Sequence, residues 1–554
     1  MISKKLNDKG IVLLMIAIIT LQACIPMKEK VDFILINGKV YTVNDSFQMM
    51  EAFAVKDGRF IAMGETEYIM SAYKSDVVYD AGNHPVYPGL IDGHSHFYGY
   101  GENLYRYADL KGTHSFDEVL ERLKAHYSAH PSEWILGRGW DQNDWEGQRF
   151  PDNEALENLF SDKKILLIRI DGHASLASKA ALEAAGINKN TVVPGGEVVL
   201  NESGNPSGIL IDNADQAVKN LVSKLTDAEK EIALLEAQQN CFAVGLTSVT
   251  DAGLPYQTIE LIRKLQNEGK LKIRINAWID PDKETMEYYL PRGPQVTDLL
   301  TVNAVKMYAD GALGSRGAKL LQPYTDEPSK TGLILHDSSF YEEVARQAYN
   351  AGFQVNMHAI GDSAVRFVLD LYASFLNDKN DRRWRVEHSQ VVHSEDFDLY
   401  GQYNIIPSIQ STHATSDMGW AGDRLGSERL KGAYAQKQLL EQNGWIVNGT
   451  DFPIEGINPV GTFFSAVFRK NLEGFPENGF QMENALTREE ALRSMTIWAA
   501  KGSFEENLKG SIEKGKLADF VIFNRDIMEV SEQDVLECKP LVVYSSGVKV
   551  FGQN

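Results

Sequence analysis

Polar and apolar positions alternate along both ends of the chain. Near the N-terminus, VDFILINGKVYTVND (residues 31–45) and AFAVKDGRFIAMGE (residues 52–65) alternate and are broken by Asn-Gly and Asp-Gly pairs, which are typical of strands joined by tight turns. Near the C-terminus, GSIEKGKLADFVIFN (residues 510–524) and PLVVYSSGVKVFG (residues 540–552) show the same strand pattern. We therefore predict that the two chain ends form one small β unit.

Between these ends, stretches with helical periodicity alternate with short apolar runs. Helical spacing of apolar residues occurs in residues 115–130, 227–245 and 487–504. The short apolar runs are GLTSVTDAG, IRINAWI, NAVKMYADG, FQVNMHAIG, RWRVEHSQ and WIVNGTDFP. Strands that alternate with helices indicate an α/β architecture with a parallel sheet.

The N-terminus has the pattern of a secretory signal peptide. A lysine-rich start, MISKKLNDKG, precedes the apolar run IVLLMIAIITL, which is shorter than the ~20 residues that a membrane-spanning helix needs. The run leads into LQAC, which resembles the lipobox of bacterial lipoproteins, with Cys24 as the lipidated residue. We expect residues 1–24 to be a lipoprotein-type signal peptide, and the mature chain to be exported and lipid-anchored to a bacterial membrane, facing the periplasm or the cell surface. A plain cleaved signal, with Cys24 incidental, is the alternative.

Length and charge narrow the range of partners. A chain of 554 residues is expected to contain more than one structural unit. Its formal charge is −21 at pH 7, so a polyanion would be repelled over much of the surface, and nucleic acid is excluded as an expected partner. After Cys24, the remaining Cys241 and Cys538 have no CxxC spacing, so neither a disulfide framework nor a cysteine zinc site is indicated.

Several apolar runs end in a residue that can bind a metal or move a proton. In PGLIDGHSHF, His94 and His96 are two residues apart, so on a strand they face the same side while Ser95 faces the other. Equivalent positions at the ends of later runs are occupied by Lys306, His358, His388 and Asp451. In a (β/α) barrel the C-terminal ends of the strands converge on the active site, so these residues are expected to meet.

The ordered motifs PGLIDGHSH, VKMYADGALGSR, VNMHAIGD, RVEHSQ and NGTDFP resemble the metal-dependent amidohydrolase superfamily, and within it the YtcJ-like branch that contains N-substituted formamide deformylases. The resemblance runs from about residue 31 to the C-terminus. It implies an α/β fold with a distorted TIM (β/α)8 barrel over residues 88–504 and a composite β-sandwich from residues 31–87 plus 505–554. Residues 101–237 are far longer than an ordinary connection and are expected to form an inserted, lid-like subdomain over the barrel mouth.

The resemblance also implies a ligand set. His94 and His96 would bind a first metal together with Asp451, and His358 and His388 would bind a second. Lys306 resembles the lysine that many relatives carbamylate, and a carbamate can bridge two cations. Neutral imidazoles and carboxylate oxygens suit Zn²⁺, so we expect two zinc ions, with Mn²⁺ or Fe²⁺ as alternatives.

One alternative ligand arrangement stays open. An unmodified lysine, with a pKa near 10.4, is a poor metal ligand at neutral pH. Lys306 would then pair with a carboxylate such as Asp310, the site would hold a single metal, and His388 would polarise the substrate.

The expected reaction is hydrolysis of a non-peptide carbon–nitrogen bond, of the N-acyl or N-formyl amide type, in a small-molecule substrate. A metal-activated hydroxide would attack the carbonyl carbon, and Asp451 would accept a proton and pass it to the departing nitrogen as general base and then general acid. Hydrolysis of a cyclic amide or imidazolone is the nearest alternative. The other is a catalytically silent lipoprotein that binds a metabolite. A homodimer is the expected assembly if the chain associates.

Three further residues are predicted to contact substrate. His173 lies in RIDGHASLAS, which resembles the pocket-lining segment GHAAWVNS of the family, although Ser178 stands where the family usually has asparagine. Trp140, in GRGWDQNDW, belongs either to a lid over the substrate or to a small hydrophobic cluster. Arg316 would hold a substrate carboxylate with two hydrogen bonds, and a buried structural ion pair is its alternative role.

Overall fold

The structure is a computed structural model that describes residues 28–378 and 380–552. The predicted signal peptide and Cys24 therefore lie outside the described residues. Within these two ranges, no helix is both long enough and apolar enough to cross a membrane.

The centre of the molecule is a nearly closed barrel of parallel strands, as predicted. In order around the barrel, the strands are β10 (Leu90–Ser95), β17 (Leu246–Leu254), β18 (Arg274–Ile279), β20 (Leu300–Tyr308), β21 (Gln354–Ala359), β22 (Arg385–His388), β23 (Ile406–Ile409) and β24 (Val447–Asn448). Two backbone hydrogen bonds connect the segment after the last strand to the end of the first: Asp451 N–H donates to His94 C=O and His96 N–H donates to Phe452 C=O, each at 2.8 Å. The distorted TIM barrel is confirmed.

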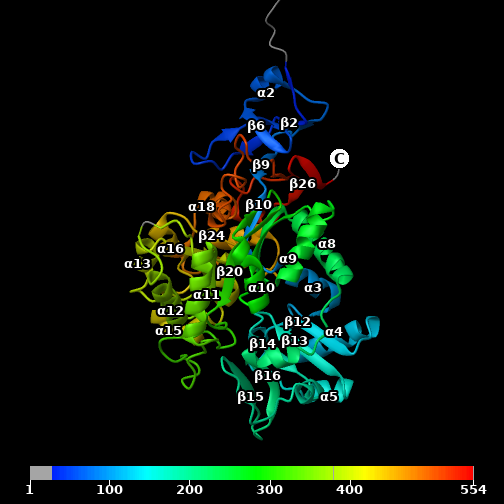
Figure 1. Cartoon of the computed structure of the whole chain (residues 1–554), viewed down its shortest axis with the longest axis vertical. Helices are drawn as coiled ribbons and strands as arrows, with labels where there is room; N and C mark the ends of the chain where they lie inside the picture. Colours follow the sequence, from blue (N-terminus) through cyan, green and yellow to red (C-terminus); the bar gives the residue numbers. More distant parts are fainter. Residues whose placement is uncertain (1–27, 379, 553–554) are drawn as a thin grey trace, which may run out of the picture.

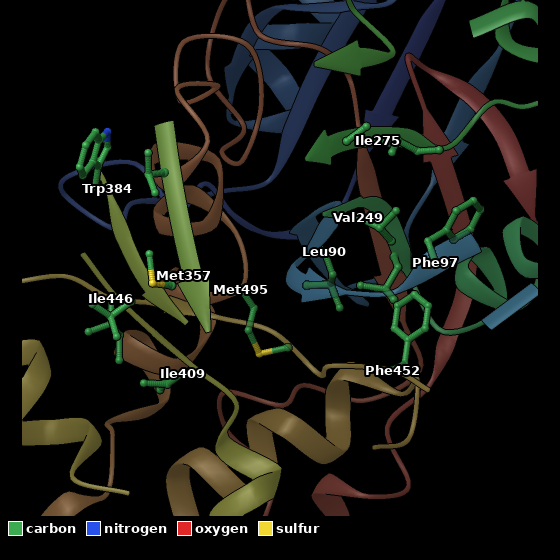
Figure 2. Packing of buried hydrophobic residues seen from close by; sticks show 14 of the residues in the cluster. Leu90, Phe97, Val249, Ile275, Met357, Trp384, Ile409, Ile446, Phe452 and Met495 are labelled. Carbon is green, nitrogen blue, oxygen red and sulfur yellow. The ribbon is translucent and has the colours of Figure 1, made fainter. Parts of the chain in front are cut away.

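Helices between the strands cover the apolar outer face of the barrel. They include α8 (Asp227–Ala243), α9 (Tyr256–Asn267), α11 (Ser338–Ala351) and α12 (Asp362–Ala373). Helix α8 begins with a capping box, in which the side chains of Thr226 and Glu229 each accept a hydrogen bond from the other residue's backbone N–H. Between strands and helices lies one continuous hydrophobic core, in which Leu90 and Val249 of neighbouring strands pack near Phe97 (Figure 2).

Strands from both chain ends share a sheet at one end of the barrel (Figure 1). In this six-stranded sheet, β25 (Phe520–Phe523) pairs with both β26 (Pro540–Ser545) and β9 (Pro85–Pro88). A four-stranded sheet from the N-terminal region packs against it: β6 (Arg59–Gly64), β5 (Ala52–Lys56), β2 (Phe33–Ile36) and β8 (Val78–Asp80). Phe33 and Phe53 of the smaller sheet contact Phe520 of the larger one, so apolar faces of the two sheets meet. This is the small β unit that the alternation at both ends predicted.

A third sheet lies at the opposite end of the barrel (Figure 1). We call it the inserted sheet; it consists of β11 (Ala108–Asp109), β12 (Trp134–Trp140), β13 (Lys164–Arg169), β14 (Ala174–Ala177), β16 (Pro206–Asp212) and β15 (Gly196–Leu200), in that spatial order. It has a separate hydrophobic cluster on each face. The predicted insertion extended to residue 237, but α8, which begins within that range at Asp227, packs on α3 (Phe97–Arg106) and β17 of the barrel.

Candidate metal centre

The predicted metal ligands lie at or beside the C-terminal ends of barrel strands, where parallel strands meet at one edge. His94 and His96 are at the end of β10, Lys306 in β20, His358 in β21, His388 at the end of β22, and Asp451 just after β24. Among these six, His94, His388 and Asp451 bring ligand atoms within 4.8 Å of one another, and all three are buried. His96 lies beside them, with its Nε2 3.3 Å from Asp451 Oδ1.

The turn that carries Asp451 is shaped by its sequence, NGTD. A Cβ atom on Gly449 would lie 2.4 Å from the backbone nitrogen of His94, so only glycine allows this approach. Thr450 donates its backbone N–H and its hydroxyl to the buried Asp92, at 3.0 and 2.7 Å. Asp451 itself has a left-handed φ of 62°, a conformation that costs about 1–3 kcal/mol in a non-glycine residue and is concentrated at functional sites.

Hydrogen bonds behind the ligands orient the imidazole rings. His94 Nδ1 is 2.6 Å from Glu387 Oε2, and Glu387 in turn accepts hydrogen bonds from Arg385 (2.7 Å) and Ser408 (2.6 Å). His388 Nδ1 is 2.7 Å from Gln410 Oε1. With each Nδ1 occupied, the Nε2 atom is the one available to a metal, which is the arrangement of histidine ligands in metalloproteins.

The electrostatics of this site favour metal ligation. Burial, and then the charge of Lys306, lower the pKa of His94 to about 4. Burial and the neighbouring His358 hold the pKa of His388 well below its usual value. Burial opposes ionisation of Asp451, but the contact with His96 and the other imidazoles outweigh it and keep its pKa well below the usual range. At neutral pH the site therefore presents neutral imidazoles and an ionised carboxylate, the forms that bind cations.

A divalent cation fits this group of atoms. Asp451 Oδ1 is buried and has no hydrogen-bond partner among the described residues, although a buried polar atom without a partner is costly. Nitrogen and oxygen atoms with this convergence are the donor set that Zn²⁺ uses in proteins.

Lys306 and His358 lie next to the three convergent ligands. Lys306 is fully buried, and its Nζ is 3.5 Å from His94 Nε2. Its predicted alternative partner, Asp310, instead accepts hydrogen bonds from the backbone N–H groups of Lys319, Ile360 and Gly361. Burial lowers the pKa of Lys306 to about 8. The His358 ring centroid is 4.6 Å from that of His388.

One histidine of the site, His413, was not predicted from the sequence. His413 lies in α14 (Ser411–Asp417), directly after β23, and its Nε2 is 3.5 Å from Asp451 Oδ2. The rings of His413 and His388 are stacked, with their centroids 5.8 Å apart. His413 Nε2 has no hydrogen-bond partner within the described part of the chain. The run NIIPSIQSTH carries the same signal as the other motifs, an apolar strand followed by a histidine.

The metal site opens into a cavity of about 330 Å³, here called the main cavity. One side of its lining comes from the barrel ends, and the other from the inserted sheet and the loops next to it, through Asp141, Arg169 and His173. His173 is thus in the cavity wall, where its Nδ1 is 2.7 Å from Asp212 Oδ1. The inserted sheet therefore forms a wall of the site that the barrel alone would leave open.

Trp140 does not line the main cavity, because a bulge turns it to the other face of the inserted sheet. Arg138 and Trp140 are two residues apart in β12 and would share a face under strict alternation. The pairing with β13 shifts register between them, and Gly139 has a φ of 108°. Trp140 is consequently 1% exposed, donates its Nε1 hydrogen to Leu167 C=O (2.9 Å) and packs with Trp145. Its assignment as a substrate contact is corrected in favour of the hydrophobic cluster.

Arg316 also lies outside the main cavity. It makes an ion pair with Asp326 at 2.8 Å, and Asp326 pairs with Arg424 as well. The structural ion pair, which was the alternative role of Arg316, is the one observed. Its partner is ten residues further along the chain, in a loop that no motif identified.

Comparisons with known proteins identify the family of the chain. The chain matches the amidohydrolase family over residues 77–551. It is 31% identical to YtcJ of Bacillus subtilis, covering 91% of this chain and 97% of that protein. It is 27% identical to the N-substituted formamide deformylase of Arthrobacter pascens, covering 94% of this chain and 98% of that protein. The structure of an uncharacterized metal-dependent hydrolase from Pyrococcus horikoshii superposes on this chain with a TM-score of 0.73 at 27% sequence identity. The match covers 90% of this chain and 99% of that protein. The chain therefore belongs to the amidohydrolase family and is a hydrolase that acts on carbon–nitrogen bonds other than peptide bonds.

Proposed function

We propose that the protein hydrolyses an N-acyl or N-formyl amide, releasing a carboxylate and an amine. The observation that carries this proposal is the buried convergence of His94 and His388 on Asp451, whose Oδ1 has no hydrogen-bond partner among the described residues, at the wall of a cavity. The similarity to an N-substituted formamide deformylase supports an amide with a small acyl group.

Two zinc ions are the proposed cofactors, with Mn²⁺ or Fe²⁺ as alternatives. His94, His96 and Asp451 would hold one ion, and His358 and His388 the other, with Lys306 between them. A bound divalent cation lowers the pKa of water toward ~7 and polarises a carbonyl oxygen. The alternative of one cation is supported by the three residues whose ligand atoms already lie within 4.8 Å.

Asp451 is the proposed proton-transfer group. Its carboxylate is ionised and touches the space where water and the scissile carbonyl would meet, so it can accept the proton of the attacking water. Delivering that proton to the departing nitrogen converts a poor leaving group into a neutral amine. His413 also lies beside this carboxylate, with its Nε2 3.5 Å from Asp451 Oδ2.

Lys306 is proposed to be carbamylated. Its burial lowers the pKa to about 8, so a larger share of the side chain is the free amine at neutral pH than for an ordinary lysine. The free amine can add to the carbon of CO₂ and lose one proton, which gives a carbamate anion with two oxygen ligands. No described carboxylate lies within ion-pair distance of the Lys306 ammonium, so its conversion breaks no ion pair.

A substrate panel tests the proposed function. We would supply the chain without residues 1–24 with zinc and bicarbonate, offer N-formyl amides, N-acyl amides and cyclic amides, and measure amine and carboxylate release. Asp451→Asn is expected to lower kcat at least about 1000-fold, because proton transfer is lost. Asp423→Asn, at an exposed position, is the matched control and should keep activity. Release that is equal in Asp451→Asn and the parent protein would contradict the proposal.

The panel also separates the two alternatives. Turnover confined to the cyclic amides would favour a cyclic amide or imidazolone hydrolase. A protein that binds zinc but releases no product from any class would favour a catalytically silent binding lipoprotein.

We further propose that the mature protein is exported and lipid-anchored through Cys24, and that a small molecule, not nucleic acid, is its partner. Fractionation of cells that express the full chain and Cys24→Ala is the test. The full chain should sediment with membranes and Cys24→Ala should not, whereas equal membrane association would argue against the lipid anchor. Sedimentation of the soluble form would distinguish the expected homodimer from a monomer.

A further inference from the structure

A second cavity, of about 450 Å³, adjoins the main cavity. The two share His96, His173 and Tyr308 in their walls, so a molecule held at the metal centre can extend past these side chains into the second cavity. Each volume is within the usual range for small-molecule sites, which is roughly 300–1,000 Å³. The second cavity therefore offers room for a part of the substrate that does not react.

Arg138 of β12 lines this second cavity, and its charge is unpaired within the described residues. Its guanidinium forms neither a hydrogen bond nor an ion pair with any described residue, and its Nε is buried. Space for the side chain comes from Gly172, where a Cβ atom would lie 3.3 Å from Arg138 Nη2. The bulge at Gly139 that turns Trp140 away leaves Arg138 on the cavity side.

The other charged side chains in the wall of the second cavity are paired. Lys219 contacts Asp215 at 2.8 Å. Asp171 accepts a hydrogen bond from Arg169 at 2.6 Å. Two further carboxylates are paired in the same way: Asp212 with His173, and Glu102 with Arg106. Arg138 is therefore the one arginine or lysine in this wall, among the described residues, whose charge is left without a contact.

We propose that Arg138 binds a carboxylate group of the substrate in the second cavity, at the end of the molecule away from the scissile bond. This inference rests on the proposed amide hydrolysis and names its substrate class: amides that carry a carboxylate on the amine or the acyl part. A guanidinium can hold a carboxylate with two parallel hydrogen bonds, and such charge-assisted bonds are stronger than neutral ones. The role that the sequence assigned to Arg316 thus belongs to Arg138.

A singly charged carboxylate fits this wall better than a phosphate. The single uncompensated positive charge of Arg138 matches one negative charge, whereas Asp171 and Asp212 beside it would repel the second charge of a phosphate ester. Asp171 and Asp212 are already hydrogen-bonded, so they can stay in place when a carboxylate binds.

Matched substrates test the proposal. One series is N-formyl amino acids with the carboxylate one to five CH₂ groups from the nitrogen, each compared with the N-alkyl formamide of the same length. The other is succinyl and glutaryl monoamides, compared with butyryl and valeryl amides. Metal-loaded wild-type protein should prefer the carboxylate-bearing member of at least one pair by about 10- to 100-fold in kcat/KM.

Arg138→Met should abolish that preference, mainly by raising KM, and leave kcat/KM for the neutral member within about threefold. Arg138→Lys should restore part of the preference for carboxylate-bearing substrates, because lysine supplies the positive charge but not the planar guanidinium group that makes two parallel hydrogen bonds. Arg149→Met, at an exposed position of the insertion, also removes one positive charge. It should change neither the preference for the carboxylate-bearing member nor kcat/KM for the neutral member. An equal kcat/KM for both members of every pair in the wild type, or an equal loss for both in Arg138→Met, would overturn the proposal.

Binding without turnover separates this inference from the proposed function. If no amide is hydrolysed, the metal-loaded protein is titrated calorimetrically with hexanoate and with hexanamide. Hexanoate should bind wild type at least about 10-fold more tightly than Arg138→Met, and hexanamide should bind both alike. Equal hexanoate affinity of the two proteins would overturn the role of Arg138 even though the amide chemistry had failed independently.

Discussion

The barrel side of the site and the inserted sheet use arginines in opposite ways: Arg385 is fully buried, whereas Arg138 is half-buried with a buried Nε. Arg385, at the start of β22, donates hydrogen bonds to Glu387 (2.7 Å), to Gly93 C=O (2.8 Å) and to Ser408 (2.8 Å). Arg138, in the inserted sheet, makes no hydrogen bond with any described residue. A buried charge with partners can hold neighbouring groups in position, whereas one without partners costs stability unless a ligand completes it. The barrel arginine thus orients the candidate metal ligand His94 through Glu387, and the inserted arginine is free to bind the proposed substrate carboxylate.

The largest expected effect is on the barrel side. Arg385→Met should lower the free energy of unfolding by about 3–5 kcal/mol, because Glu387 is then a buried carboxylate without its cation. Urea denaturation of the metal-free protein, followed by tryptophan fluorescence, measures this change. A loss below about 1 kcal/mol would mean that the pair does not stabilise the barrel.

Glu387→Gln should weaken metal binding about 10- to 100-fold, because His94 loses the carboxylate that orients its ring. Competition with a zinc-binding dye gives the affinity. Glu428→Gln, at an exposed ion pair with Lys431, is the control and should bind zinc like the parent. Unchanged zinc affinity in Glu387→Gln would remove Glu387 from the metal centre.

Because of Glu387, the free energy of unfolding is expected to depend on pH. Burial opposes its ionisation, but Arg385 and His94 lower its pKa to about 2, from an ordinary value of 4.5. Because the folded pKa is the lower one, the stabilisation is present above pH 4.5 and is lost as the pH falls toward 2, at roughly 1.4 kcal/mol per pKa unit. Between pH 5 and pH 2 the free energy of unfolding should therefore fall more steeply with decreasing pH for the parent than for Glu387→Gln. Equal slopes for the two proteins would contradict the lowered pKa of Glu387.

Lys306→Ala should reduce bound zinc from two ions to one per chain, because the proposed carbamate bridge is lost. Elemental analysis of protein prepared with bicarbonate gives the count. Two ions in Lys306→Ala would contradict the bridging role of Lys306, and a single ion in the parent would favour the one-metal arrangement.

The smallest expected effect is on the inserted side. Arg138→Met should change the free energy of unfolding by less than about 1 kcal/mol, because no hydrogen bond or ion pair within the described residues is broken. The same urea denaturation applies. A loss as large as that of Arg385→Met would remove the difference between the two arginines and make Arg138 a structural residue.

The candidate metal ligands could be predicted from the sequence because their positions follow a simple rule. His94, His388 and Asp451 each end an apolar run, and parallel strands bring such ends together whatever their separation along the chain. His413 obeys the same rule after IIPSIQ and could have been found with it. The barrel and the sheet shared by both chain ends followed from hydrophobic periodicity in the same way.

The cavity wall on the inserted side could not be predicted because it depends on local detail. A one-residue bulge at Gly139 decides whether Arg138 or Trp140 faces the cavity, and a period of two cannot reveal a bulge. Arg316 shares a motif with barrel residues, but its partner Asp326 is supplied by a loop whose course no pattern indicates.

Metal removal shows most directly whether the protein is a metal-dependent amidohydrolase. Amine release from an N-formyl amide would be followed after chelation and during stepwise return of Zn²⁺, with bound zinc counted in the same samples. A metal-dependent amidohydrolase should lose release with its metal and regain it in proportion to the zinc bound. Equal release from the metal-free and the zinc-loaded protein would show that hydrolysis does not depend on the metal.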